Sequence, residues 1–239
     1  MLRVDMATEH LSDEALYRLM AWLSPGFPVG AYAYSHGLEY AVEDRRVADE
    51  AGLLTWIEGI LSLGAGRIDG PLFTAAWKAV EAGDEAALAD AAELAACLRA
   101  TSEQALESSA QGEAFIATVR ETWASDEFSR LCDVLRKGER PIAYSIAVAV
   151  AAAAAGVPLR PALIAYFHAF AANLTSAGVR LIPLGQVAGQ RVIEALREAV
   201  AAAADAAITE PLSAIGSAAP LVDWTSIKHE TQYTRLFRS

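Results

Sequence analysis

The chain has 239 residues, a formal net charge of −11 and hydrophobic side chains at 54% of its positions. This length suits one large domain, and the apolar content is sufficient for a sizeable core. The acidic balance excludes a nucleic-acid binder that relies on clustered lysine and arginine. Much of the apolar content is alanine, the strongest helix former, so the composition predicts an all-α protein.

The first predicted helix begins at Ser12-Asp13-Glu14, where a capping residue precedes two first-turn acids, and it ends at Ser24-Pro25-Gly26. Apolar residues at helical spacing then predict four further helices. These lie near residues 53–61, 71–80, 84–98 and 102–124, with Pro71 at the start of the second and Asp84 capping the third.

Two long apolar helices are expected to open at Pro141 and Pro161, separated by Gly156-Val157-Pro158. A last helix is expected from the Pro183-Leu184-Gly185 break to about Ala204. No alternating strand pattern or repeat is present. We therefore predict a single-domain all-α bundle of roughly eight to ten helices, with a flexible N-terminus (1–11), a helical domain (12–204) and a linker with a flexible C-terminal tail (205–239).

Motifs of catalysis and metal binding are absent from the sequence. It contains no phosphate-binding GxxxxGK[ST] loop, no HExxH, no CxxC and no GxSxG. Cys97 and Cys132 lack metal-ligand spacing, and nothing indicates an oxidising compartment. We therefore predict a non-enzyme without catalytic residues, cofactor or metal site. The apolar run at residues 142–156 is too short to span a bilayer, which favours a cytoplasmic protein.

Two other functions remain as alternatives. In the first, the chain is a metal-binding helical enzyme in which His36, His168 or His229 converge with nearby carboxylates. In the second, the apolar region 141–182 lies on a membrane surface, although anionic lipids attract basic rather than acidic proteins. The overall charge of −11 argues against membrane binding.

Three segments have compositions that helix formation alone does not explain. The first, residues 23–39, is punctuated by Pro28, Gly30 and Gly37 and is rich in aromatics. Glycine permits left-handed backbone conformations, so this segment is expected to have a defined shape. It is either a tightly packed connection between helices or a surface that presents side chains to a partner. The side chains best suited to such contacts are Tyr32, Ser35, His36 and Glu39.

The second segment follows His168 on the long apolar helix. Asn173 and Arg180 lie seven residues apart on one helical face, where polar groups need either internal partners or a subunit interface. The segment continues through a structural motif formed by Pro183, Gly185, Gln186 and Gln190.

The third segment, residues 228–239, combines apolar anchors with charges, as segments that order on a partner do. Its candidate contact residues are His229, Glu230, Tyr233, Arg235, Leu236, Phe237 and Arg238.

The three segments contain PVGAYAYSHGLE, SAGVRLIPLGQ and HETQYTRLFRS. In this order and spacing they resemble the signatures of the UreF family of urease accessory proteins, over roughly residues 12–239. The resemblance implies an all-α homodimer that acts as a non-catalytic scaffold for nickel insertion into apo-urease. Its implied partners are the GTPase UreG, which it recruits and modulates, and UreD, also called UreH.

On this resemblance we assign the first segment to the GTPase side and the third to the UreD/UreH side. The resemblance and the apolar helix together place His168, Asn173 and Arg180 at the dimer interface. No nucleic-acid or membrane partner is expected.

Overall fold

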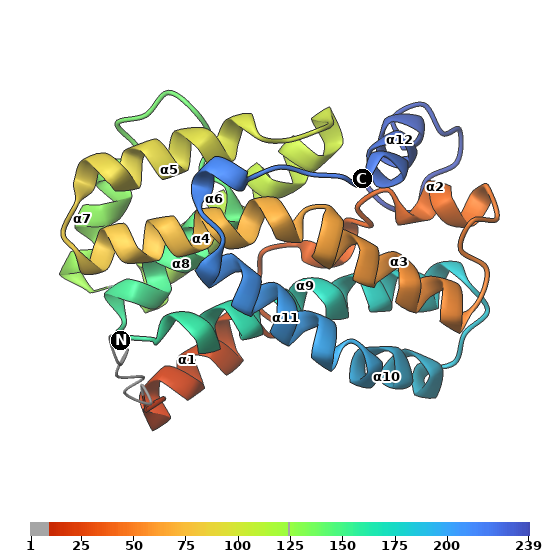
Figure 1. Cartoon of the computed structure of the whole chain (residues 1–239), viewed down its shortest axis with the longest axis horizontal. Helices are drawn as coiled ribbons and strands as arrows, with labels where there is room; N and C mark the ends of the chain where they lie inside the picture. The colour runs from red at the N-terminus through yellow and green to blue at the C-terminus, as the bar shows by residue number, and fades with distance from the viewer. Residues whose placement is uncertain (1–9, 124) are drawn as a thin grey trace, which may run out of the picture.

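The computed structural model describes residues 10–123 and 125–239. These residues form twelve α-helices and two short 3-10 helices and no strand (Figure 1). The all-α prediction is confirmed, and the number of helices exceeds the predicted eight to ten. The predicted flexible N-terminus lies almost entirely outside the described residues. The helices are α1 (Asp13–Trp22), η1 (Ala31–Ala33), α2 (Leu38–Glu43), α3 (Glu50–Leu63), α4 (Gly66–Glu81), α5 (Glu85–Cys97), α6 (Ser102–Thr122), α7 (Asp126–Leu135), α8 (Tyr144–Ala154), α9 (Leu159–Leu181), α10 (Gln186–Ala195), α11 (Arg197–Thr209), η2 (Leu212–Ala214) and α12 (Pro220–His229).

The core is built around α4 and α8. Helix α8 consists largely of alanine and valine, and its side chains from Ser145 to Ala153 are all buried. Helix α4 packs against α5, α8 and α11. In Figure 1, α3 and α4 follow one another along the long axis, with α5 on one side and α10 and α11 on the other. The short side chains of α8 and α11 allow neighbouring helices to pack closely around the core.

The predicted helix caps at two starts are confirmed. The Ser12 hydroxyl accepts a hydrogen bond from the Ala15 N–H, and the Asp84 carboxylate accepts one from the Ala87 N–H. Each satisfies a main-chain donor that the first turn leaves free.

The proline-based starts are wrong in detail. Pro71 lies inside α4, because Gly64 and Ala65 alone connect α3 to α4 and the helix must begin before the proline. Pro141 lies ahead of α8, whose cap is Ala143. Pro161 lies within the first turn of α9, where its missing N–H costs no helical hydrogen bond.

Helix α9 is long and apolar enough to cross a membrane by length and composition. Half of its most apolar stretch is nevertheless buried within the protein, against α3, α8, α10 and α11. A core helix of a soluble protein passes the same test, and α9 occupies such a position.

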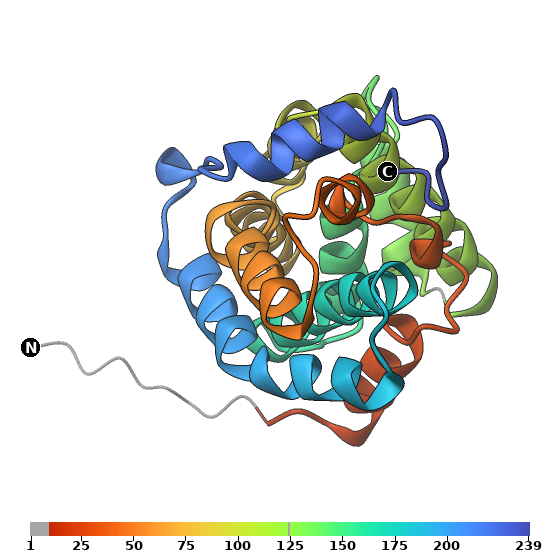
Figure 2. The same cartoon turned by 90° about the vertical axis from the view of Figure 1, so that its right-hand side faces the viewer.

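The C-terminal segment was predicted to be flexible, but it packs on the body of the protein. Helix α12 lies against α2 and α6, and Phe237 and Ser239 are buried. Figure 2 views this end of the molecule and shows α12 and the C-terminus beside the segment that carries η1 and α2. The face of α12 that packs inward includes Thr225, Ser226 and His229, so hydrophobic periodicity does not reveal it.

Gly37 permits the close approach of α12. Its φ is +77°, and a Cβ at this position would lie 2.8 Å from the Ser226 nitrogen and 2.9 Å from the Thr225 hydroxyl. Because the nearest atom belongs to the main chain, α12 would have to shift to accommodate a side chain. Gly30 also has a positive φ, +72°, but nothing lies within 4 Å of a Cβ there.

We expect Gly37→Ala to lower the free energy of unfolding by about 3 kcal/mol, since it adds a steric clash to left-handed strain. Gly30→Ala should cost only the strain, about 1 kcal/mol. Urea unfolding followed by circular dichroism measures both. Equal costs for the two variants would contradict the proposed constraint on α12.

Candidate functional site

The three unusual segments of the sequence meet in space. The Asn173 amide donates to the Tyr34 main-chain oxygen at 3.3 Å, which joins α9 to the first segment. The Arg180 guanidinium stacks on the Phe237 ring at 4.4 Å, which joins α9 to the C-terminal segment. The Ser35 N–H donates to the Ser239 main-chain oxygen at 2.9 Å. Residues distant in the sequence therefore form one continuous site.

Five buried side chains form the centre of this site, and we call them the carboxylate–histidine network. His229 contacts two of the carboxylates: its Nδ1 lies 2.7 Å from Glu103 Oε2, and its Nε2 lies 3.0 Å from Glu39 Oε2. Each ring nitrogen of His229 therefore faces a carboxylate oxygen at hydrogen-bonding distance. The members of the network are His36, Glu39, Glu103, Glu107 and His229.

Glu39 and Glu103 hold the C-terminal segment directly. The Glu39 carboxylate accepts hydrogen bonds from the Leu236 N–H at 2.6 Å and the Phe237 N–H at 2.9 Å. Glu103 accepts one from the Arg235 guanidinium at 3.0 Å. Charge-assisted hydrogen bonds of this kind are about twice as strong as neutral ones. The extended end of the chain therefore has defined partners.

Glu107 holds the last described residue and the first segment together. Its Oε2 accepts a hydrogen bond from the Ser239 hydroxyl at 3.0 Å and lies 3.2 Å from His36 Nδ1. Its other oxygen accepts the Gln111 amide at 3.4 Å. The His36 ring also packs edge-on against Phe170 of α9, with the ring centroids 5.4 Å apart. His36 thus makes long-range contacts within the chain.

The acidic side chains of α6 were missed by the sequence analysis. The net acidic charge gave no reason to expect buried carboxylates, yet Glu103 and Glu107 are buried. The two glutamates and Gln111 recur every four residues, so they share one face of α6. This repeat was the signal in the sequence that could have revealed the buried glutamates, because His36 and His229 both need hydrogen-bond partners.

The structure separates the four residues assigned to the first partner surface. Tyr32 is 71% exposed, whereas Ser35, His36 and Glu39 are buried. The three buried residues bind the chain's own C-terminal segment. They can therefore influence a partner only indirectly, by stabilising the conformation of the surface that includes Tyr32. Tyr32 remains available for direct contact.

The residues of the second segment lie along the solvent side of α9. His168 and Arg180 are exposed, and Asn173 is half-buried. In the structural motif, Gly185 precedes α10 and Gln186 begins it. Gln186 and Gln190 line a shallow groove with Arg180. Among the remaining motif residues, Pro28 and Pro183 are exposed.

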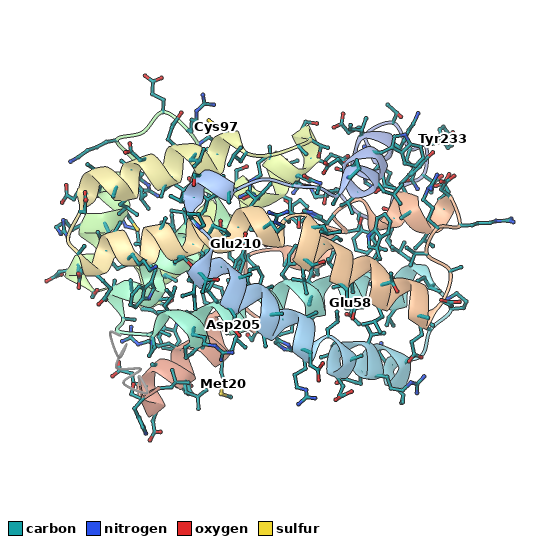
Figure 3. The ribbon with its side chains drawn as sticks, in the orientation of Figure 1. Met20, Glu58, Cys97, Asp205, Glu210 and Tyr233 are labelled. Atoms are coloured by element: carbon teal, nitrogen blue, oxygen red, sulfur yellow. The ribbon has the colours of Figure 1, made fainter. Side chains whose placement is uncertain are left out.

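The third segment is divided between buried and exposed residues. His229 and Phe237 are buried, whereas Leu236 is 63% exposed and Tyr233 projects fully into solvent (Figure 3). Residues 230–239 are not helical, so Tyr233, Leu236 and Phe237 do not form the single stripe that a helix would give.

The charged residues of the third segment also have partners within the chain. Glu230 accepts a hydrogen bond from the Ser102 hydroxyl at 2.6 Å. The Arg238 guanidinium lies 5.7 Å from the centre of the Tyr34 ring.

A pocket of about 330 Å³ opens beside the network, and we call it the Tyr32 pocket. Its walls come from residues 23–32 and from α9, including His168 and Asn173. Glu107, Gln111 and Tyr144 also line it. Burial raises the pKa of the Tyr144 phenol well above its ordinary value, so its hydroxyl remains protonated and neutral.

The histidines do not form a recognisable metal centre within the described part of the chain. No group of three or more histidine, cysteine, aspartate or glutamate residues there is arranged to hold a metal ion. His36 contacts one glutamate, and His229 contacts a different carboxylate with each nitrogen. In these contacts each histidine forms hydrogen bonds that connect different segments of the chain.

The fold and the site define an all-helical protein whose buried polar side chains fasten its C-terminal segment to its N-terminal one. Comparison with known proteins identifies the family. The UreF family model matches residues 47–197. The urease accessory protein UreF of Granulibacter bethesdensis is 49% identical over 232 residues, 97% of each chain. That of Rhodopseudomonas palustris strain HaA2 is 50% identical over 225 residues, 94% of each chain. The chain belongs to the UreF family of urease accessory proteins.

We expect His229→Gln to lower the free energy of unfolding by about 3 kcal/mol, because it removes a buried ring that contacts two buried carboxylates. Amide exchange should accelerate most at Leu236 and Phe237, which Glu39 holds. The matched control, His10→Gln, changes an exposed histidine ahead of α1 and should cost less than about 0.5 kcal/mol. Unchanged exchange at Leu236 and Phe237 would refute this role for His229.

Proposed function

We propose that this protein is a non-catalytic cytoplasmic scaffold for nickel insertion into apo-urease. In this role it recruits and modulates the GTPase UreG within a complex that also contains UreD/UreH. Membership of the UreF family supports the proposal. The observation that carries it is the contact among the three signature segments, in which Tyr32 and Tyr233 are exposed.

The GTPase side of the proposed scaffold centres on Tyr32 and its pocket. An exposed tyrosine supplies a large contact area with little loss of side-chain freedom on binding. Ser35, His36 and Glu39 support this surface from below, because they connect it to the C-terminal segment. Their expected effect on the GTPase is therefore indirect.

The UreD/UreH side of the scaffold centres on Tyr233 and Leu236. Both are exposed although they belong to a segment whose main chain is firmly hydrogen-bonded. A large apolar side chain held in solvent by a fixed backbone has already lost part of its conformational entropy, so binding costs less. Glu230, Arg235 and Arg238 belong to the same segment and would supply polar contacts.

The dimer interface in this proposal lies on the exposed side of α9, at His168, Asn173 and Arg180. His168 and Asn173 also line the Tyr32 pocket. The dimer surface and the GTPase surface therefore adjoin. A second copy seated there would extend the surface available to the GTPase.

We expect Tyr32→Ala to weaken UreG recruitment at least tenfold in a pull-down with purified UreD/UreH, since an exposed aromatic anchor is lost. The fold should be intact, because the side chain is exposed. Tyr17→Ala is the control: Tyr17 is exposed at 65% on α1 and does not line the pocket. Full UreG recruitment by Tyr32→Ala would contradict the assignment.

We expect the double variant Tyr233→Ala and Leu236→Ala to keep its thermal stability and lose UreD/UreH binding. The control is Ile227→Ala, which truncates an exposed side chain on α12. Deleting the whole segment is a poorer test, since it strips partners from Glu39 and Glu103. If the double variant captures UreD/UreH at the wild-type level, these side chains are not the contact.

A further inference from the structure

The Tyr32 pocket contains hydrogen-bond acceptors that the described chain leaves unused. No described residue forms a hydrogen bond with the Tyr144 hydroxyl, and burial alone accounts for the shift of its pKa. Gln111 donates its amide to Glu107, which leaves its side-chain oxygen without a partner among the described residues. Both residues line the pocket, so a ligand that supplies hydrogen-bond donors can pair with these groups there.

The charge of the pocket lining comes from Glu107, which also interacts with His36 and Arg99 outside the lining. Among the described lining residues Glu107 is the one carboxylate, and none of them is a lysine or arginine. Glu107 is 5% exposed, and a carboxylate at such depth interacts strongly with charge because little water screens it. His36 faces Glu107 from behind the pocket, and His168 lies in the wall.

The remaining walls suit a positive group. Phe27, Phe170 and Tyr144 contribute aromatic rings, whose faces attract cations. Pro25 and Pro28 lie in the wall and have carbonyl oxygens but no N–H groups, so the segment is richer in acceptors than in donors. Aromatic faces, carbonyls, a phenol and a carboxylate together form a lining that accepts N–H donors.

We propose that the Tyr32 pocket receives the cationic end of a lysine or arginine side chain from the recruited GTPase. This inference rests on the proposed function, because it takes Tyr32 as the GTPase side. Tyr32 at 71% exposure provides the surrounding contact surface, and the inserted cation is the anchor at its centre.

Other kinds of occupant fit the pocket less well. An anion would meet the Glu107 carboxylate, and the described residues that line the pocket include no arginine or lysine. A purely apolar side chain would leave Tyr144 and Gln111 unpaired. The volume of about 330 Å³ accommodates one long side chain and is far smaller than a folded element.

The first experiment uses the full chain and two small probes. N-acetyl-arginine amide carries the guanidinium, and N-acetyl-citrulline amide is its neutral counterpart of nearly the same shape. In an NMR titration we expect the arginine probe to bind at least tenfold more tightly, with shifts at Gln111, Tyr144 and residues 25–32. Equal affinities would overturn the proposal, and so would shifts located elsewhere.

The second experiment compares two buried tyrosines. Tyr144→Phe removes only the hydroxyl that lines the pocket and should weaken the arginine probe about tenfold. Tyr166→Phe is the matched control, because its ring lies 5.7 Å from the Tyr144 ring and its hydroxyl interacts with Asp69 outside the pocket. Equal probe affinities in Tyr144→Phe and the wild type would refute the role of the hydroxyl. The comparison of arginine with citrulline on wild-type protein does not depend on how either variant folds.

The third experiment is competition. At saturating concentration the arginine probe should reduce UreG recruitment, and the citrulline probe should not. Recruitment that is unchanged while the pocket is filled would reject the GTPase as the source of the cation. A wild-type chain that recruits no UreG at all would instead refute the proposed function, so the two failures are distinguishable.

Discussion

Two buried carboxylates hold the C-terminal segment through one buried histidine. Glu39 comes from α2 and Glu103 from α6, and His229 lies between them with one nitrogen on each. Unpaired charges at this depth would each cost several kcal/mol, so the segment cannot leave without a large penalty. The positions of Arg235, Leu236 and Phe237 follow from the same two side chains. The shape of the surface that carries Tyr32 and Tyr233 thus depends on this pairing.

Much of the fold could be predicted from the sequence because most helices bury an apolar stripe. Alanine content and helical spacing indicated α3, α5, α6, α8 and α9, and the caps at Ser12 and Asp84 were correct. Helix α12 was missed because its buried face includes Thr225, Ser226 and His229. Its packing is polar, so a method based on hydrophobic periodicity could not detect it.

The site was predictable as a set of segments and not as a set of contacts. The unusual composition of residues 23–39 and 228–239 identified both segments, but spacing could not show that they bind each other. The partners of Ser35 and Glu39 lie about two hundred positions away, as the separations of 204 and 198 residues show. Sequence analysis therefore assigned side chains such as His36 to contact with an external partner, whereas other residues of the same chain form hydrogen bonds with them.

The length of these connections has a consequence for how the protein is made. A ribosome delivers Ser35, His36 and Glu39 about two hundred residues before residues 229–239, while helices of local sequence form as they emerge. Until residues 229–239 appear, Glu39 and Glu103 lack the partners that this segment supplies. Assembly of the surface is thereby delayed until synthesis reaches this segment. A chain without residues 229–239 would therefore lack the contacts that shape this surface.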